Sequence, residues 1–182
     1  MAKNKNNKAI WGVRIKNNNS SIFQRIGNSI DIDKRLYKED IIGSIAHVEM
    51  LFKQKIISFQ IKNKIIYGLN KIEKEILNKK FEFNTKYEDI HINIEKRLFQ
   101  IIGEEAGYIH TARSRNDQVI TDFKIWIKSS TKNINLALDK IIKSSLNLAD
   151  KNINTIMPGF THLKNAQPIS FAHYLMAYIE MF

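Results

Sequence analysis

The chain has 182 residues, of which 43% are hydrophobic and 26% are charged, enough apolar material for one ordinary domain and part of a second. It contains no cysteine, which excludes a disulfide scaffold, thiolate zinc ligands and a cysteine nucleophile. No apolar run approaches the roughly 20 residues of a membrane span, and the basic N-terminus lacks the apolar stretch of a signal peptide. We therefore expect a soluble cytoplasmic protein with no membrane partner.

The basic charge is compatible with more than one class of protein. The chain has 29 Lys and Arg residues against 18 Asp and Glu residues, a net charge of +11, which invites a nucleic-acid interpretation. However, the excess is mostly lysine scattered along predicted helices, and Lys, Ile and Asn are abundant together, as AT-rich codon usage produces. We expect no nucleic-acid partner, because an enzyme that handles anionic metabolites fits the charge equally well.

Three helices are predicted in the first part of the chain by apolar residues that recur every three to four positions. Residues 1–20 precede them and are predicted to form a flexible basic arm, because they are polar and rich in asparagine. A capping box at Thr85 and Glu88 predicts the start of the third helix, and Gly103 predicts its end. The apolar positions are Ile41, Ile45, Val48 and Phe52; Ile65, Leu69, Ile72 and Ile76; and Ile94, Leu98 and Ile101.

A much longer helix is predicted over about 114–150, which contains neither proline nor glycine. Because globular helices average roughly 11 residues, this one needs partners along its apolar stripe and predicts a bundle. Residues 157–168 hold both prolines and are predicted to be a loop, with Pro168 in the first turn of a last helix. His173 lies on the apolar stripe of that helix, which favours a hydrogen-bonded core histidine. The helical pattern is still running at Phe182, so we expect a truncated chain.

The polar stretch His110–Gln118 lies where the long helix is predicted to begin. Ser114 and Asp117 have the spacing of an N-cap and an acidic residue in the first turn. Arg113 and Arg115 add planar guanidinium groups suited to carboxylates, and free backbone N–H groups at a helix start also favour an anion. An anion site for carboxylate or phosphate is one interpretation, and a solvated loop with an ordinary cap is the other.

Histidines supply the candidates for proton transfer. His162 follows Thr161 in the Pro-Gly segment and could exchange protons near pH 7, although a surface histidine in a turn is the alternative. His91 lies in the first turn of a predicted helix, where the helix dipole favours the neutral form, and the simpler interpretation is a helix-surface histidine. Ser29 could cap a turn or contact a ligand, and Gln167 is a weaker candidate.

Six short motifs follow one another along the chain. They are Trp11-Gly12-x-Arg14; Asn28-Ser29-Ile30 with Asp33-x-Arg35-Leu36; Asp40-Ile41-x-Gly43-Ser44-x-Ala46-His47; Glu88-Asp89-Ile90-His91 with Glu95-x-Arg97-Leu98; His110 to Val119; and Pro158 to Leu163 with Ala166-Gln167-Pro168. In this order they resemble the argininosuccinate lyases, a family within the fumarase/aspartase superfamily of helical lyases. The His110–Val119 block is highly specific, because sister lyases have other residues there. Val13, Tyr108 and Phe160 depart from the family's usual residues, and Tyr108 removes a positive charge beside the implied site.

The resemblance implies an all-α fold, in which an N-terminal helical domain is followed by the start of a fumarase/aspartase-like long-helix bundle, here truncated. We expect a flexible arm at 1–20, an N-terminal helical lyase domain at 21–112 and an incomplete first part of the central bundle domain at 113–182. The family is more than twice as long, and the serine loop that supplies the partner catalytic residue is absent here. The 182-residue chain alone is therefore expected to be inactive.

The resemblance also implies the reaction, a reversible β-elimination of argininosuccinate to L-arginine and fumarate in arginine biosynthesis, without metal or organic cofactor. His162 would be the acid/base residue, and His91 and His110 would support it through hydrogen bonds. The substrate-binding residues implied by the motifs are Ser29, Arg113, Ser114, Arg115, Asn116, Thr161 and Gln167. In the family three subunits of a homotetramer meet at each site, so these segments need not converge within one chain.

Functions of other classes stay open at this point. One is a non-catalytic relic or structural homologue of the lyase, and another is a basic helical nucleic-acid-binding protein, which salt-dependent retention on DNA or RNA would reveal. A sister lyase acting on adenylosuccinate is the alternative within the same class, and the His110–Val119 block disfavours it. The DNA downstream of Phe182 would show whether the reading frame continues with the serine loop.

Overall fold

The fold is described by a computed structural model, which covers residue 22 and residues 26–182. The predicted arm at 1–20 and the motif around Trp11 lie outside these described residues. The chain divides into two compact units, one ending at Phe123 and the other spanning Lys124–Phe182, and each is described by itself. The domain boundary expected at residue 113 stays a prediction.

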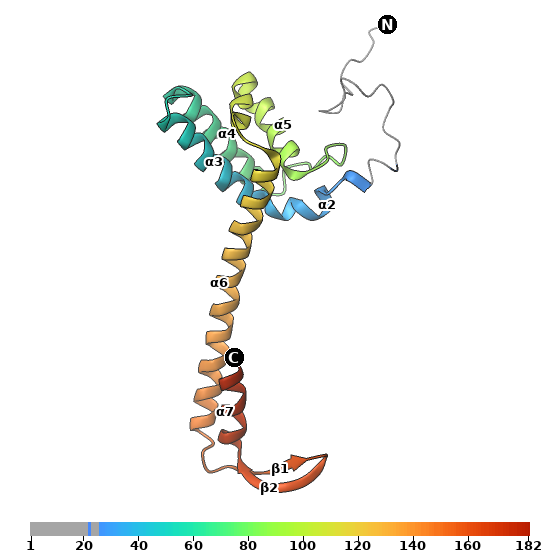
Figure 1. Ribbon diagram of the computed structural model, residues 1–182, viewed down its shortest axis with the longest axis vertical. Coiled ribbons are helices and arrows are strands. Elements are labelled where there is room, and N and C mark those ends of the chain that lie inside the picture. The colour runs from blue at the N-terminus through green and yellow to red at the C-terminus, as the bar shows by residue number, and fades with distance from the viewer. Residues whose placement is uncertain (1–21, 23–25) are drawn as a thin grey trace. The chain divides into compact units, whose positions relative to one another are not determined.

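The described elements are almost all helices (Figure 1). In chain order they are α2 (Ile30–Asp33), a 3-10 turn (Lys34–Leu36), α3 (Tyr37–Lys53), α4 (Phe59–Leu77), α5 (Ile90–Ile102), a 3-10 helix (Gly103–His110), α6 (Arg115–Asp150), β1 (Ile156–Thr161), β2 (Lys164–Ser170) and α7 (Phe171–Met181). Among the described helices, none has both the length and the apolar character that a membrane crossing requires. The long helix predicted over about 114–150 is confirmed as α6.

Three helices of the first unit, α3, α4 and α5, pack around one apolar core (Figure 1). The most deeply buried side chains are Ile41, Val48 and Leu51 of α3, Ile65, Leu69 and Ile72 of α4, and Ile90, Ile94 and Leu98 of α5. Removing this apolar surface from water is the main term that stabilises the unit. Gly68 lets α4 and α5 approach closely, because a Cβ at this position would collide with Leu98 Cδ1. The helical periodicities predicted from the sequence are thereby confirmed.

The capping box predicted at the start of α5 is wrong. The N-cap is Asp89, whose Oδ1 accepts a hydrogen bond from the backbone N–H of Ile92 at 2.7 Å. Thr85 lies instead in a turn before the helix. Asn84 holds this turn against α5, because its backbone N–H donates to Asn93 Oδ1 at 2.8 Å. A tertiary contact that the local pattern does not reveal therefore sets the first residue of the helix.

Residues 156–170 form a two-stranded antiparallel hairpin where the sequence predicted a loop over 157–168. The two prolines face each other in the register, so Pro168 lies in β2 and not in the first turn of a helix, as had been expected. Each strand of an isolated hairpin is an edge strand, where a residue without an N–H is tolerated. Pro158 opposite Pro168 therefore does not prevent the pairing.

The hairpin turn has a specific backbone conformation. Thr161 and Lys164 are the last paired residues, and His162 and Leu163 between them have φ values of 50° and 62°. A two-residue turn with both φ values positive matches the right-handed twist of the strands it joins. His162 is thus held in the left-handed region at the tip of the hairpin.

The last helix starts later than the sequence predicted. α7 begins at Phe171, and the Ser170 hydroxyl accepts a hydrogen bond from the backbone N–H of His173 at 3.0 Å. No described residue of α7 is buried, and His173 itself is exposed. The expectation of a core histidine at this position is therefore wrong within the second unit.

Candidate active site

The polar block His110–Gln118 leads directly into α6. Ser114 precedes the first helical residue, and its Oγ accepts a hydrogen bond from the backbone N–H of Asn116 at 3.3 Å. Its carbonyl oxygen accepts from the backbone N–H of Gln118 at 3.1 Å. Asn116 is exposed in this first turn, where the N-terminal end of the helix favours a bound anion. The start of α6 is thus an ordered and exposed first turn, and anion binding there stays a prediction.

The two arginines of the block are held by different partners. Arg113 Nη1 donates to Ser44 Oγ of α3 at 2.9 Å. Arg115 Nη1 donates to Gln118 Oε1 at 2.7 Å, and its Nη2 donates to Glu95 Oε1 at 3.0 Å. Because a guanidinium group has five N–H donors, these contacts fix the orientation of each group and leave other donors for a ligand.

His110 is coupled to the same network. Its Nε2 lies 2.6 Å from Glu95 Oε1, the oxygen that also accepts from Arg115. Glu95 therefore links the histidine to the guanidinium group. Glu95 lies within a motif quoted above, but the sequence analysis gave it no role.

Ser29 is fixed at the junction of α2 and α5. Its Oγ donates to Asp33 Oδ2 at 2.6 Å, and its backbone N–H donates to the carbonyl of Glu88 at 2.8 Å. Asp33 Oδ1 in turn accepts from the backbone N–H of Ile90 at 3.1 Å. Burial raises the pKa of Asp33, although the hydrogen bond from Ser29 opposes this shift. Ser29 is thus an ordered hydroxyl beside an ionisable carboxyl group.

His91 is buried, whereas the sequence analysis favoured a neutral histidine on a helix surface. Its Nδ1 donates to Asp40 Oδ1 of α3 at 2.9 Å, and both side chains are almost fully buried. Burial disfavours the charged imidazole, but the hydrogen bond and the charge of Asp40 outweigh this and raise the pKa of His91. The prediction failed because a carboxylate from another helix acts more strongly than the dipole of α5.

A second carboxyl group completes this buried cluster. Asp122 of α6 is 0% exposed, and its Oδ2 lies 3.6 Å from His91 Nδ1. Burial, which is the larger cause, and the negative charge of Asp40 together raise the pKa of Asp122 to about 7. Gln118, also on α6, donates from Nε2 to Asp40 Oδ1. The hydrogen bonds from His91 and Gln118 keep the pKa of Asp40 below its usual value despite its burial.

The three ionisable side chains of this cluster are also close enough together to be considered as metal ligands. Donor atoms of Asp40, His91 and Asp122 lie within 4.8 Å of one another, a spacing that would suit a cation. A metal requires a neutral imidazole with a lone pair on the coordinating nitrogen, but Nδ1 of His91 donates to Asp40. The raised pKa of His91 likewise favours the imidazolium form. We therefore interpret the cluster as a hydrogen-bonded set of ionisable groups.

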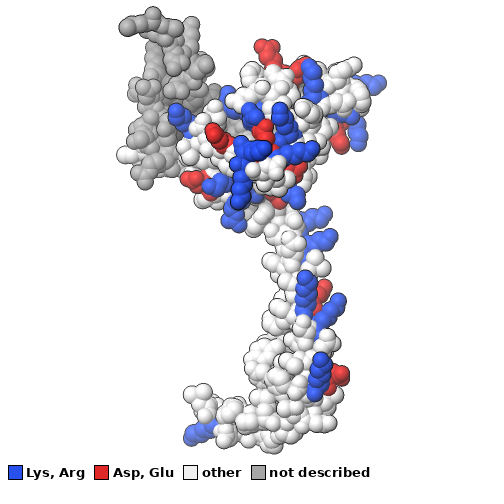
Figure 2. Space-filling view, turned by 180° about the vertical axis from the view of Figure 1, so that it is seen from behind, with Lys and Arg blue, Asp and Glu red and all other residues white. Residues whose placement is uncertain are grey.

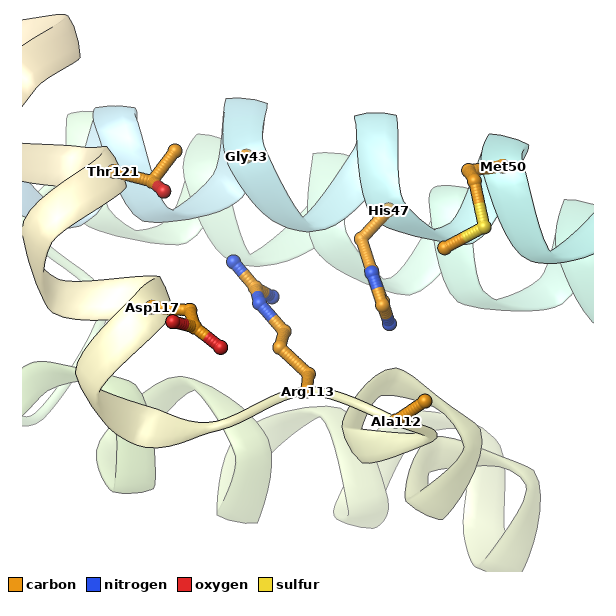
Figure 3. A pocket seen from close by; sticks show the side chains of 7 residues that line it. All are labelled: Gly43, His47, Met50, Ala112, Arg113, Asp117 and Thr121. Atoms are coloured by element: carbon orange, nitrogen blue, oxygen red, sulfur yellow. The ribbon is translucent and has the colours of Figure 1, made fainter.

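A pocket of about 290 Å³ lies beside this cluster (Figure 3). Figure 3 shows the Arg113 side chain extending from the chain before α6 toward α3, with Asp117 of α6 on one side and His47 of α3 on the other. His47 Nε2 donates to the carbonyl of Thr111 at 3.0 Å, and burial lowers its pKa. The pocket thus combines a fixed cation with a neutral histidine.

Three predicted site residues, Thr161, His162 and Gln167, belong to the hairpin of the second unit. All three are exposed. Thr161 and Gln167 line a pocket of about 380 Å³ between the hairpin and α7, together with His173. The structure therefore gathers Ser29, His91, His110 and the Arg113–Asn116 block in one unit and the hairpin residues in the other. Hydrogen bonds and the Glu95–His110 contact join only part of the first group, namely His91, Asp40, Gln118, Arg115, Glu95 and His110. Ser29 is held separately by Asp33, and Arg113 by Ser44.

Charged side chains are distributed over both units. On the face shown in Figure 2, Lys and Arg side chains lie on the first unit and along α6, with Asp and Glu side chains among them and uncharged residues between. Side chains of both signs are therefore interspersed on this face of the described chain.

Comparison with known proteins gives the family. A family model described as Lyase matches residues 13–182. The chain belongs to this lyase family. The lyase chain is 77% identical over all 182 residues to the argininosuccinate lyase of Pelagibacter ubique and covers 39% of that protein. It is 49% identical over 182 residues to the argininosuccinate lyase of Chelativorans sp. and covers 38% of it. The lyase chain thus spans about two fifths of the length of the curated relatives it matches.

Solved structures agree with the fold of the lyase chain. It is 26% identical to a variant of EDDS lyase with bound fumarate, with a TM-score of 0.71 over 82% of this chain and 29% of that chain. It also resembles a cobalt-bound fumarate lyase:delta crystallin from Brucella melitensis, at 15% identity and a TM-score of 0.68, over 85% of this chain and 37% of that chain. The second likeness concerns the fold alone. The resemblance and the all-α lyase fold inferred from the motifs are confirmed, with the β1–β2 hairpin as an addition.

Several residues of this candidate site were missed by sequence reasoning. Asp33, Asp40 and Glu95 lie within the quoted motifs, so their positions could have been flagged, but not their partners. Gln118 was named only as the end of a polar block. Asp122 had no sequence signal, because a single acidic residue in a long helix is usually a solvent-exposed one.

Proposed function

We propose that this chain belongs to an argininosuccinate lyase that cleaves argininosuccinate reversibly to L-arginine and fumarate, a step of arginine biosynthesis. The observation that carries the proposal is the 77% identity to one such lyase over all 182 residues. The solved relative with bound fumarate supports it, because fumarate is the second product of the proposed reaction. A related lyase thus offers a site of suitable shape and charge for that dicarboxylate.

The reaction would proceed by β-elimination. A base removes a proton from the carbon next to a carboxylate, and the electron pair remains on the substrate as a carboxylate-stabilised dianion. The double bond of fumarate then forms as the C–N bond breaks, and an acid protonates the departing guanidino nitrogen. Fixed cations and donors are needed to stabilise the dianion. In this scheme His162 is the acid/base residue, and its partner serine comes from outside this chain.

The start of α6 suits the binding of the succinyl carboxylates. Arg113 and Arg115 are oriented by Ser44 and by Glu95, so their remaining N–H groups need little reorganisation to meet a ligand. Asn116 adds an exposed neutral donor, and Ser114 shapes the first turn around it. Ser29, Thr161 and Gln167 would complete the substrate contacts. His91 and His110 would act indirectly, through Asp40 and Glu95.

We also propose that the whole protein is a cytoplasmic homotetramer that needs no cofactor. Exposed apolar side chains on α6 support assembly with other helices, because monomers seldom expose such a stripe. They are Val119, Ile120, Ile127, Ile134, Leu136, Ile141, Leu146 and Leu148. In such an assembly the hairpin residues of one subunit can serve a site formed by another.

The test is an assay of the full-length protein with argininosuccinate, in which fumarate is followed by its ultraviolet absorbance. Adenylosuccinate and aspartate serve as controls for sister activities. Fumarate released from argininosuccinate alone is the expected result. A folded protein without turnover of any of the three would instead favour a structural homologue. Salt-dependent retention on DNA with no turnover would favour a nucleic-acid binder.

A further inference from the structure

The buried cluster of the first unit has an unbalanced set of groups. Two carboxyl groups, Asp40 and Asp122, face one imidazole, that of His91, and all three are buried. Asp40 Oδ1 accepts from two donors, whereas neither oxygen of Asp122 has a hydrogen-bond donor within the described structure. The one imidazole, 3.6 Å from Asp122 Oδ2, is shared with Asp40, and a buried carboxylate without a hydrogen-bond donor of its own is destabilising, so Asp122 needs a further proton or cation.

We propose that Asp122 holds a proton that it shares with Asp40, and that this pair is a positioning element for the two arginines before and at the start of α6. The proton makes Asp122 a donor toward Asp40. The cluster then contains one carboxylate, one imidazolium and one neutral acid, so that its charges cancel. This inference about positioning rests on the proposed lyase function, whereas the shared proton does not.

A proton fits the hydrogen bonds better than a divalent cation does. His91 Nδ1 and Gln118 Nε2 both donate to Asp40 Oδ1, so this oxygen is already the acceptor of two N–H groups. A cation at the same place would require His91 to lose that proton and turn a lone pair inward. The groups that face Asp122 are Asp40 from α3, His91 from α5 and Arg113 from the segment before α6. Only a proton on Asp122 leaves all of their contacts in place.

Arg113 is tied to this pair through α3. A Cβ added at Gly43 would lie 2.9 Å from Asp122 Oδ1 and 3.5 Å from Arg113 Nη2, so both groups occupy the space that the glycine leaves. Arg113 Nη1 meanwhile donates to Ser44 Oγ. If Asp122 lost its proton, the new negative charge would attract the guanidinium group away from Ser44. The neutral acid thus keeps Arg113 in its observed position.

Arg115 is tied to the pair through Gln118. The Gln118 amide has only one orientation that serves both neighbours: its Nε2 donates to Asp40, and its Oε1 accepts from Arg115 Nη1 at 2.7 Å. Asp40 is the stronger acceptor while Asp122 is the protonated partner, because hydrogen bonds to an ionised carboxylate are stronger than those to a neutral acid. The hydrogen-bonded series therefore runs from Asp122 through Asp40 and Gln118 to Arg115.

The first test is the stability of the full-length protein. Asp122→Asn replaces the neutral acid by a neutral amide that can still donate to Asp40, and Asp139→Asn makes the same change at an exposed position of α6. A raised pKa in the folded state means that stability is lost as pH rises toward about 7. We expect the melting temperature of Asp122→Asn to decline less with pH than that of the unaltered protein, and Asp139→Asn to follow the unaltered protein.

The second test is the Michaelis constant. If only the protonated form binds argininosuccinate well, KM rises about tenfold from about pH 6 to about pH 8, because the competent fraction falls by that factor. Asp122→Asn should flatten this rise, while kcat changes less. An Asp122→Asn protein that melts far below the unaltered protein at every pH would overturn the shared proton. A divalent cation that raises the melting temperature of the unaltered protein but not that of Asp122→Asn would overturn it too. If the melting behaviour is as expected but argininosuccinate is not cleaved, the lyase function and the positioning role fail while the shared proton stands.

Discussion

Replacing His162 by asparagine separates catalysis from folding at the tip of the hairpin. His162 has a φ of 50° and is exposed, so its side chain fills no core space. Asparagine tolerates the left-handed conformation better than other side chains with a Cβ, because its short polar group bonds locally. We therefore expect His162→Asn to change the free energy of unfolding by about 0.5 kcal/mol or less.

The effect on turnover should be much larger. Loss of a general acid or base lowers a rate by roughly 10²–10⁴. Fumarate production by the full-length protein should fall by that factor, and the melting temperature should stay nearly constant. His162→Ala should also lose turnover, but it should cost about 1 kcal/mol of stability, because alanine is disfavoured at a positive φ.

The neighbouring turn residue supplies the matched control. Leu163 has a φ of 62° and is 98% exposed, so Leu163→Asn makes the same kind of change in the same turn without touching the imidazole. It should keep both turnover and stability. Near-normal arginine production by a folded His162→Asn protein would refute His162 as the acid/base residue. It would also refute the assignment of Thr161 and Gln167 in the same hairpin as substrate-binding residues.

Four further outcomes are expected. Asn116→Ala in the full-length protein should weaken substrate binding by about 1.5–3 kcal/mol, because a donor to a carboxylate is lost, and calorimetric titration would measure it. Asp89→Ala removes the N-cap of α5 and should cost about 1 kcal/mol in urea unfolding, whereas Asp89→Asn should cost less. Gly68→Ala overpacks against Leu98 and should cost about 1–3 kcal/mol, while Gly27→Ala, with open space around it, should not. The 182-residue chain alone should self-associate in sedimentation, because α6 exposes an apolar stripe, and a stable monomer would contradict this.

The helices could be predicted from the sequence because their signals are local. Apolar spacing identified the buried faces of α3, α4 and α5, and Gly103, with a φ of 80°, ends α5 as predicted. The length of α6 followed from the absence of proline and glycine over 36 residues. These features depend on neighbours within two helical turns, which the sequence displays directly.

The hairpin could not be predicted, because its signals point elsewhere. Two prolines in a short segment normally argue against a strand. Asn-Gly is the usual pair in a two-residue turn with positive φ values, and the residues here are His162 and Leu163. The pairing of Pro158 with Pro168 removes the conflict only when both strands are edges, a property of the folded hairpin that composition does not show.

The candidate site shows the same limit at the first turns of α6, where the polar face is the buried one. Gln118 and Asp122, four residues apart, lie on one side of the helix and are buried against α3 and α5, whereas Val119 and Phe123 are 38% and 45% exposed. A reader of the sequence assigns the apolar stripe to the core, because burial of polar groups is costly unless partners are present. The partners are Asp40 and His91, which lie far away along the chain. The local sequence pattern therefore does not predict that the polar side of α6 is the buried one. The apolar stripe of α6 is then available to pack against other helices, and the buried polar face contributes Gln118 and Asp122 to the candidate site.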